Sequence, residues 1–543
     1  MSENQQSEAT ELPQNNLTSP PKNVFEKKAQ WTFPGGIHPD DKKNISNQNA
    51  IQIMACPETL YIPITNYKGH PAVTDVKPGD LVKHGASLVT SIDTPSSRVC
   101  SPVDGLVVSI EKRNTLHPSQ LPTPTIVLKT DESSSHFKKP SAEKNLSDLK
   151  NAEILEIIRQ AGIAGLGGAA FPTHAKVDVA TPIKMLIING IECEPYISCD
   201  DRLMRERADE ILVGIQIIER LVQPERIVFA IEDNKPEAVK NVEEAIIAAK
   251  IDTVKIAVVP TKYPSGGEKQ LIQILTGQEV PAQTLPSKLG ILMHNVGTCY
   301  ALKRALLHGE PSISRVVTVT GEAVSHPGNY ECLIGTPIDF ILEQAGIDQN
   351  KLSQVIIGGP MMGIAIANLD VGIDNSVNCI IAATRSEIFH TDQHAPCIRC
   401  GQCADVCPAS LLPQQLFWYA NAKNLVKLDE YHLDDCIECG ACAYVCPSQI
   451  PLVHYYRFGK SLKQQKNQEF EKSEHAKQRF EFRQERLERE KIERAQRHKK
   501  AAEERQKRAT TNTGDDKKQA IMEALARVKA KQASSAPKDQ KTE

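Results

Sequence analysis

The 543-residue sequence lacks any apolar run long enough to cross a membrane. Its most apolar stretch, residues 355–369, is interrupted by Gly358, Gly359 and Pro360, whereas a membrane-spanning helix needs about 20 apolar residues in succession. The amino-terminal residues are polar and lack the apolar centre of a secretion signal. A formal net charge of −3 argues against general nucleic-acid binding. These absences predict a cytoplasmic protein that neither spans a membrane nor is secreted.

Cysteine is present but unevenly distributed, since most of the 15 cysteines lie between Cys397 and Cys446. An odd total without a secretion signal does not indicate a disulfide framework, so we expect metal-ligating thiols in a reducing compartment. The cysteines outside this segment have no ligand spacing, and we expect most to be buried as small apolar side chains. They are Cys56, Cys100, Cys193, Cys199, Cys299, Cys332 and Cys379.

Composition and periodicity predict a multidomain α/β and α+β protein. We expect six segments: a disordered amino terminus (1–30), a β-sandwich of the biotinyl/lipoyl-carrier shape (31–140), an α/β domain (141–310), a β-grasp module (311–385), a cysteine-rich domain (386–456) and a charged helical or disordered tail (457–543).

The β-sandwich is predicted from short strands in residues 50–130 that turn signals separate. Biotinyl and lipoyl carriers display a modified lysine before the turn at 101–105. Residues 92–98, which hold that position here, contain no lysine, so we interpret the unit as structural.

The α/β domain is predicted from strands at 184–190, 226–233 and 253–260 that alternate with helices at 201–221 and 236–249. Such alternation is typical of a largely parallel sheet.

The tail is basic, with 24 Lys and Arg against 15 Asp and Glu from Lys460 onward. It favours helix but has no apolar heptad, so we do not expect a coiled coil. Two interpretations stay open: contact with anionic lipid or acidic partner subunits, and a solvated helix without a partner.

The cysteine-rich domain contains two runs, 397–408 and 436–447, that each read C-x2-C-x2-C-x3-C-P. This is the spacing of bacterial two-cluster [4Fe–4S] ferredoxins, in which the fourth cysteine of each run binds the other cluster. The alternative of two four-cysteine zinc sites is disfavoured because zinc ribbons do not repeat this run. The predicted ligand sets are Cys397, Cys400, Cys403 and Cys446 for cluster one, and Cys436, Cys439, Cys442 and Cys407 for cluster two.

A second group of motifs is rich in glycine and polar residues. Residues 162–176, GIAGLGGAAFPTHAK, form a glycine-rich loop whose backbone N–H groups can approach a phosphate or a planar ring. The strand that follows ends at Asn189 in NGIECEP, at the usual ligand-binding edge of a parallel sheet. YPSGGE (263–268) and HNVGT (294–298) come later. A glycine-rich loop alone more often forms a simple turn without a ligand, but here three further polar motifs accompany it.

These four motifs resemble the flavin- and NADH-binding subunit of respiratory complex I and its relatives. With WTFPGGIHP at 31–39, GGPMMG at 358–363 and the double ferredoxin run, the chain most resembles the RnfC, or RsxC, family of ion-translocating electron-transport complexes. The resemblance covers roughly residues 31–451 and implies that the β-grasp module is of the SLBB type.

The resemblance implies that the motif residues hold FMN and NADH: Gly165, Gly167, Gly168, Lys176 and Asn189 at the FMN, Phe171 near the nicotinamide, Glu194 and Glu268 near both, and Asn295 and Thr298 at the FMN phosphate. Three positions depart from the family, which has an arginine at Leu166, an acid at Ile191 and an aromatic residue at Val179. We find no Ser/His/Asp constellation and expect no separate catalytic residue.

The implied function is that of a peripheral, NAD(H)-linked subunit on the cytoplasmic side of the inner membrane. With FMN and two clusters, and together with other subunits, it would couple electron transfer between NADH and a ferredoxin-like protein to ion translocation. One alternative is the quinone-reactive relative in sodium-pumping NADH dehydrogenases. That relative lacks the ferredoxin cysteines, so the cysteines between Cys397 and Cys446 count against this alternative. A non-catalytic iron–sulfur scaffold with a vestigial flavin site is the alternative that the three departures keep open.

Overall fold

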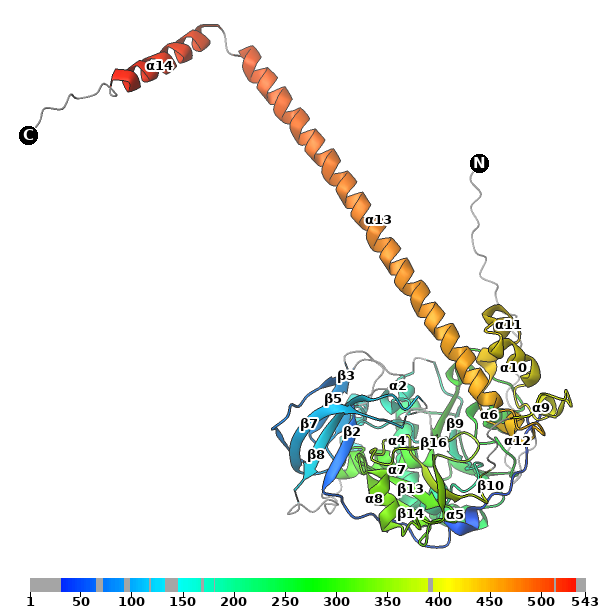
Figure 1. Ribbon diagram of the computed structural model, residues 1–543. Helices are drawn as coiled ribbons and strands as arrows, with labels where there is room; N and C mark the ends of the chain where they lie inside the picture. The colour runs from blue at the N-terminus through cyan, green and yellow to red at the C-terminus, as the bar shows by residue number, and fades with distance from the viewer. Residues whose placement is uncertain are drawn as a thin grey trace, which may run out of the picture. The chain divides into compact units, whose positions relative to one another are not determined.

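The computed structural model describes residues 31–64, 72–91, 98–116, 119–131, 145–167, 170–179, 181–388, 394–511 and 514–533 (Figure 1). The chain divides into two compact units, residues 1–460 and 461–543. Among the described residues, no helix has the length and apolar character that crossing a membrane requires. The predicted disordered segment 1–30 lies outside the described residues.

The amino-terminal β-sandwich is confirmed and consists of two antiparallel sheets. The larger has the order β2 (Thr59–Pro63), β8 (Thr123–Thr130), β7 (Gly105–Arg113), β4 (Leu81–Val82), and the smaller β3 (Ala72–Thr74), β5 (Ser87–Ser91), β6 (Val99–Cys100). Alternate side chains such as Leu60, Ile126 and Leu128 form its core. Residues 92–97 of the carrier-lysine segment lie outside the described residues.

The α/β fold is confirmed by a four-stranded sheet in which every pairing is parallel. Its order is β11 (Val254–Val259), β10 (Arg226–Glu232), β9 (Met185–Gly190), β12 (Ile291–Asn295). The strands are almost continuously buried, as is typical of a parallel sheet that is covered on both faces. One face packs on α1 (Asn151–Gln160), α5 (Pro236–Ala249) and α7 (Val296–His308), and the other on α6 (Glu268–Thr276).

The helix expected at 201–221 is two helices, α3 (Cys199–Glu206) and α4 (Ala208–Val222), so that prediction was wrong in detail. The backbone of Arg207 leaves helical values, with φ −133° and ψ 29°. No glycine or proline stands at the break, and the apolar periodicity continues through it. The sequence therefore predicts one helix where the structure has two.

The β-grasp module is built on a six-stranded sheet that one helix, α8 (Ile338–Gln344), covers. The strand order is β1 (Gln52–Ile53), β14 (Gly328–Leu333), β13 (Ser314–Thr320), β17 (Cys379–Thr384), β15 (Leu352–Ile357), β16 (Ile364–Ile366). The edge strand β1 comes from the amino-terminal segment and pairs in parallel with β14.

The cysteine-rich domain repeats its backbone as well as its spacing. Short helices α9 (Gln402–Asp405) and α12 (Ala441–Tyr444) each follow a glycine of positive φ, Gly401 at 88° and Gly440 at 79°. Helices α10 (Pro413–Asn421) and α11 (Leu425–Glu430) connect the two halves. The duplicated run therefore folds as a duplicated loop–helix unit.

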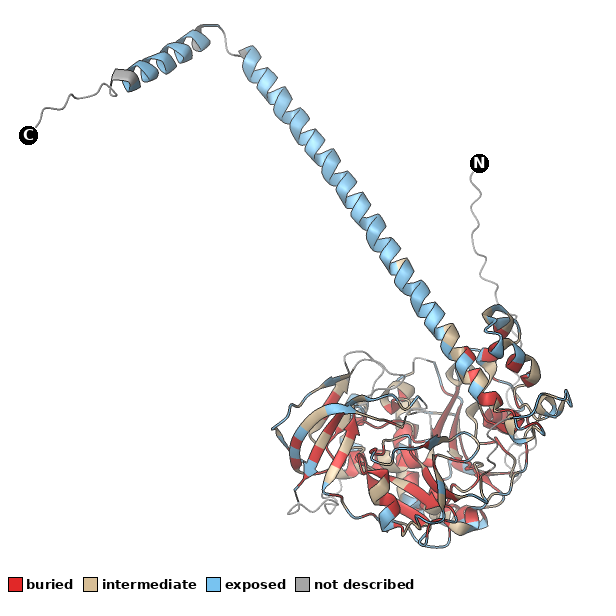
Figure 2. Ribbon diagram, in the orientation of Figure 1, coloured by how far each residue is buried: buried red, intermediate tan, exposed pale blue. Residues whose placement is uncertain are grey.

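The remaining helices are the short α2 (Thr173–Val177), the long α13 (Leu452–Thr511) and α14 (Gly514–Ala533). Almost every described side chain of α13 beyond residue 463 and of α14 is exposed, in contrast to the buried strands (Figure 2).

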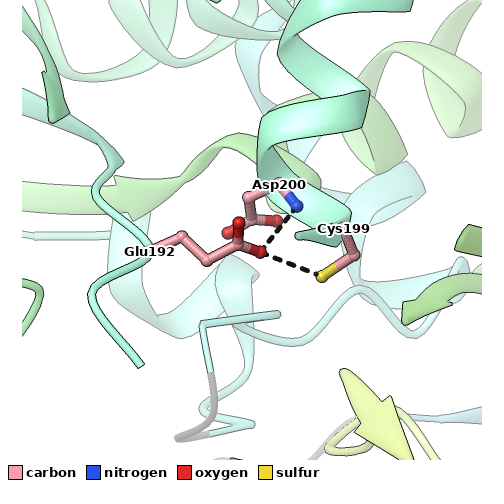
Figure 3. Close-up of side chains that lie close together, drawn as sticks. All are labelled: Glu192, Cys199 and Asp200. Carbon is pink, nitrogen blue, oxygen red and sulfur yellow. Dashed lines mark hydrogen bonds between the residues drawn. The ribbon is translucent and has the colours of Figure 1, made fainter. Parts of the chain in front are cut away.

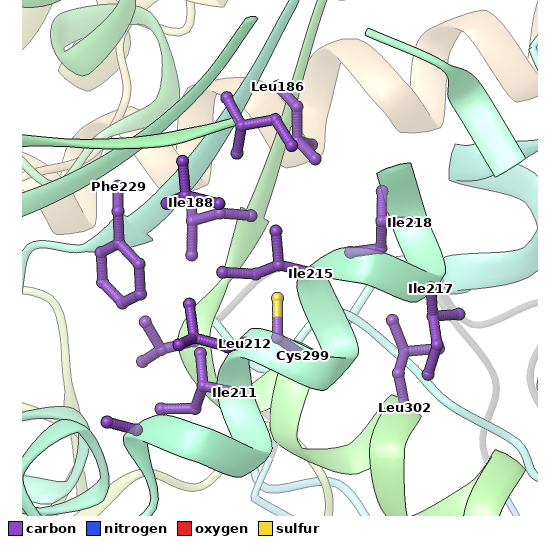
Figure 4. Close-up of a cluster of buried hydrophobic side chains, with 14 of the residues drawn as sticks. Leu186, Ile188, Ile211, Leu212, Ile215, Ile217, Ile218, Phe229, Cys299 and Leu302 are labelled. Atoms are coloured by element: carbon purple, nitrogen blue, oxygen red, sulfur yellow. The ribbon is translucent and has the colours of Figure 1, made fainter. Parts of the chain in front are cut away.

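The α/β core depends on a close approach of α4 to α7. Isoleucines and leucines of α4 meet Leu186 and Ile188 of β9 and Cys299 and Leu302 of α7 (Figure 4). Gly214 makes this packing possible, because a Cβ atom there would lie well inside contact distance of the Cys299 carbonyl. The helices meet backbone to backbone.

We expect Gly214→Ala to lower the free energy of unfolding by about 1–3 kcal/mol, because the clash outweighs the gain in helix propensity of about 1 kcal/mol. Urea unfolding of the full chain measures this. The control is Gln216→Ala, on the exposed side of α4, which should change stability little. Equal stability of both variants would contradict the packing argument.

Candidate functional site

The sheet has one topological switch point, between β9 and β12. The chain proceeds from β9 to β10 and β11 on one side and then returns to place β12 on the other side of β9. Loops diverge at such a point and leave a ligand-binding crevice at the carboxyl ends of the strands. Asn189 and Asn295 are register partners at these ends.

Both asparagine side chains organise the backbone of the crevice. Asn189 accepts a hydrogen bond from the Ile191 N–H (3.0 Å) and donates to the Gly266 carbonyl (3.0 Å). Asn295 caps α7 by accepting from the Gly297 N–H (2.9 Å) and donates to Asp200 (2.6 Å). The NGIECEP, YPSGGE and HNVGT motifs thus meet at one place.

The glycine-rich loop lies over the start of α7. Gly165 donates to the Phe171 carbonyl (2.7 Å), which closes the loop, and Thr298 Oγ1 accepts from the Leu166 N–H (3.0 Å). A Cβ on Gly167 would stand 3.3 Å from Asn295 Cβ, so a side chain there would crowd the crevice. Gly168 lies outside the described residues. The described loop leaves a cradle beside two amide side chains, which fits a flavin.

Two further predicted residues form an ion pair at this end of the sheet. Lys176 of α2 lies 2.9 Å from Glu268 at the start of α6, and both side chains are partly exposed.

Glu194, unlike the predicted residues described above, contacts the β-grasp module. Its carboxylate accepts hydrogen bonds from the N–H groups of Met361 (2.7 Å) and Met362 (3.0 Å), in the GGPMMG loop of the β-grasp module. Burial raises the pKa of Glu194 above its ordinary value. This carboxylate therefore connects the α/β domain to the neighbouring module.

A group beside the crevice was not predicted as a site: the buried Glu192 and Cys199 and the half-buried Asp200 (Figure 3). Glu192 accepts from the Asp200 N–H (2.9 Å) and from Cys199 Sγ (3.4 Å), so it caps the amino terminus of α3. Lys43, from the amino-terminal segment, lies 4.0 Å from the same carboxylate. The first acid of NGIECEP is the sequence signal for this group, but nothing local indicated Lys43.

The eight clustered cysteines line two hollows. One is lined by Cys397, Cys400, Cys403 and Cys446, and the other by Cys407, Cys436, Cys439 and Cys442. Each hollow draws three thiols from one run and the fourth from the other run. This donor set fits a cubane cluster in each hollow.

The two hollows differ in their surroundings. Cys439, beside the second hollow, accepts a hydrogen bond at its carbonyl from the buried Tyr263 hydroxyl (2.6 Å), from the YPSGGE motif. The Val406 carbonyl accepts from the Gly36 N–H (2.9 Å). The first hollow is bordered by the exposed Cys400 and by Ile398, whose exposed fraction is 67%. The second hollow therefore faces the α/β domain and the first faces solvent.

Burial raises the pKa of Glu192 to about 7, so the native state holds this proton more tightly than the unfolded chain. Stability from this group is therefore greatest below about pH 4.5 and is lost as the pH rises to about 7. The free energy of unfolding of the wild type should fall by about 3 kcal/mol over this window, and Glu192→Gln should remove this fall. Urea unfolding at several pH values measures both. The control is Glu225→Gln, at an exposed position, which should keep the wild-type pH dependence of stability. If Glu192→Gln also kept the wild-type pH dependence, the pKa of Glu192 would be ordinary and the prediction wrong.

Four domain families match the chain. Residues 31–133 match the RnfC barrel sandwich hybrid domain, 158–304 the Nuo51 FMN-binding domain, 316–365 the SLBB domain and 396–450 the 4Fe-4S dicluster domain. A crystal structure of an NAD+-reducing [NiFe]-hydrogenase in the H2-reduced state is 18% identical, with a TM-score of 0.42 over 59% of this chain and 65% of that chain. That similarity is too low to carry an argument.

The relatives share one name, that of the C subunit of an ion-translocating oxidoreductase complex. Those of Haemophilus influenzae (46% identical, 85% of this chain and 56% of the relative), Vibrio cholerae (45%, 94% and 65%) and Pectobacterium atrosepticum (44%, 94% and 72%) are examples. The chain thus spans little more than half of the first of these. The FMN-binding and dicluster domains account for the crevice and the two hollows. The chain belongs to the RnfC family, the Rnf-type electron-transfer subunits of ion-translocating oxidoreductase complexes.

Proposed function

We propose that this chain exchanges electrons between NAD(H) and a low-potential, ferredoxin-like protein, as part of a complex that couples this transfer to ion translocation. The hydrogen bond from Tyr263 to the Cys439 carbonyl carries the proposal, because it joins a motif of the flavin crevice to a cysteine loop. This contact places the two proposed cofactor sites next to one another, as electron transfer between them requires.

FMN bound in the crevice supplies the conversion between the two-electron chemistry of NADH and the one-electron chemistry of iron–sulfur clusters. The residues proposed to hold it are Gly165, Gly167, Gly168, Lys176, Asn189, Asn295 and Thr298. Phe171, Glu194 and Glu268 are proposed to lie along the nicotinamide side. The protein's part is to position these groups, so no acid–base residue is required.

The eight thiols are proposed to bind two [4Fe–4S] clusters in the exchanged arrangement. The hollow lined by Cys407, Cys436, Cys439 and Cys442 lies beside Tyr263, which supports its role as the cluster next to the flavin. The other hollow borders exposed Ile398 and Cys400, which supports contact with an external redox partner there.

We place the chain at the cytoplasmic face of the inner membrane, as a peripheral subunit of a larger complex. The relatives' name, which includes ion translocation, supports this placement. The excess of 24 Lys and Arg over 15 Asp and Glu from Lys460 onward is compatible with contact to anionic headgroups or acidic subunits.

The second candidate is an iron–sulfur scaffold whose flavin site is vestigial. Leu166, Ile191 and Val179 favour it because each replaces a polar or aromatic residue of the complex I family. The Lys176–Glu268 ion pair also favours it, since these two groups satisfy one another.

We expect the anaerobically purified chain to contain FMN and its absorbance to bleach on addition of NADH. Asn295→Ala should lower the FMN content, because it removes the cap of α7 beside the crevice. The control is Asn424→Ala, which removes an equivalent cap from α11 in the cysteine-rich domain and should retain FMN. A full iron content with no flavin and no NADH response would favour the scaffold.

Ligand exchange between the two runs is tested with serine variants. We expect about eight iron atoms per chain and none of the zinc of the alternative assignment. Cys407→Ser should alter the same electron paramagnetic resonance signal as Cys436→Ser, and Cys403→Ser the same signal as Cys446→Ser. If Cys407→Ser instead altered the signal that Cys403→Ser alters, each run would bind its own cluster and the exchange would be wrong.

A further inference from the structure

The glycine-rich loop is held at one residue, Leu166, by two different domains. Leu166 donates its N–H to Thr298 of α7 (3.0 Å), and its carbonyl accepts from the Arg315 guanidinium (2.6 Å). Arg315 belongs to β13 of the β-grasp module, about 150 residues further along the chain. The two peptide bonds that join Leu166 to Gly165 and to Gly167 are therefore each held by one hydrogen bond, the first to α7 and the second to β13.

The buried guanidinium of Arg315 binds backbone carbonyls. Its exposed fraction is 6%, and its second Nη atom donates to the Asn375 carbonyl in the loop that precedes β17. Both hydrogen bonds that the described residues give its guanidinium thus go to backbone carbonyls. A buried cation is costly unless it is hydrogen-bonded, so these carbonyls and the arginine constrain each other.

The neighbouring arginine of the same cavity is used differently. A cavity of about 40 Å³ is lined by Arg315, Leu166, Gly297 and Asp200, and also by Arg304. Arg304 forms ion pairs with Glu310 and Glu331 and makes no hydrogen bond to the loop among the described contacts. Only one of the two cations therefore reaches the described part of the glycine-rich loop.

We propose that Arg315 is a positioning residue for flavin binding, through which the β-grasp module holds the glycine-rich loop against α7. Without this donor the buried Leu166 carbonyl would lack a partner, and the Leu166–Gly167 peptide would turn toward water. Gly167 supplies the N–H half of that peptide and has no side chain to resist the rotation. The loop beside Asn295 would then lose the shape that cradles the flavin. The inference rests on the proposed role of this crevice as the FMN site.

The test measures FMN binding to the full-length apo-flavin protein by quenching of FMN fluorescence under anaerobic conditions. We expect Arg315→Gln to weaken FMN binding about tenfold or more, as for the loss of a charge-assisted hydrogen bond. Arg315→Lys can reach one carbonyl and should restore part of the affinity. Arg304→Gln, in the same cavity, should bind FMN within about twofold of wild type.

A structural role alone would give a different pattern. If Arg315→Gln and Arg304→Gln weakened FMN binding equally, or if Arg315→Gln bound FMN as tightly as wild type, the proposal would be overturned. If Arg315→Gln does not fold, as judged by its iron content, the FMN affinities of Arg315→Lys and Arg304→Lys are compared instead. Equal weakening in these two variants would likewise overturn the proposal. Failure of wild type itself to bind FMN would instead overturn the proposed flavin function.

Discussion

The central position of β9 between two parallel neighbours is the constraint on which the rest of the molecule depends. Because β9 is buried on both faces, its residues can be apolar everywhere except at its carboxyl end, where Asn189 emerges into the crevice. The reversal of strand order puts the start of α7 beside that end. The crevice is thus a consequence of how a buried parallel sheet is connected.

The loops around this end of the sheet are held by buried charges, of which Lys43 comes from the amino-terminal segment and Glu232 from the end of β10. Lys43 donates to the Glu194 carbonyl (2.9 Å), and the Glu192 N–H donates to Glu232 (3.2 Å), which is itself ion-paired with Lys235. A buried ion pair adds little to stability, but removing one partner is strongly destabilising because it leaves the other charge buried and unpaired. We interpret this network as a means of fixing the NGIECEP loop in one conformation.

The cysteine-rich domain shows how duplication and contact with a larger domain produce asymmetry. The two runs have nearly the same backbone, including the glycines of positive φ, yet the loop of Cys439 and the turn at Val406 both connect the second hollow to other parts of the first unit by hydrogen bonds. Two similar clusters would therefore differ in solvent exposure. That difference supports the proposed electron transfer between a flavin on one side and an external partner on the other.

The sequence alone determined the fold classes and the two ferredoxin runs, because these depend on local periodicity and on spacing within about 12 residues. It also identified Asn189 as a polar residue at a strand end, whereas the strand that ends at Asn295 was not predicted. Only the tertiary structure decided that Arg315 and Lys43 serve this crevice, that Glu194 binds the Met361–Met362 backbone, and that β1 joins the β-grasp sheet. These contacts join residues up to about 280 positions apart, and a long-range contact leaves no pattern in the residues next to either partner.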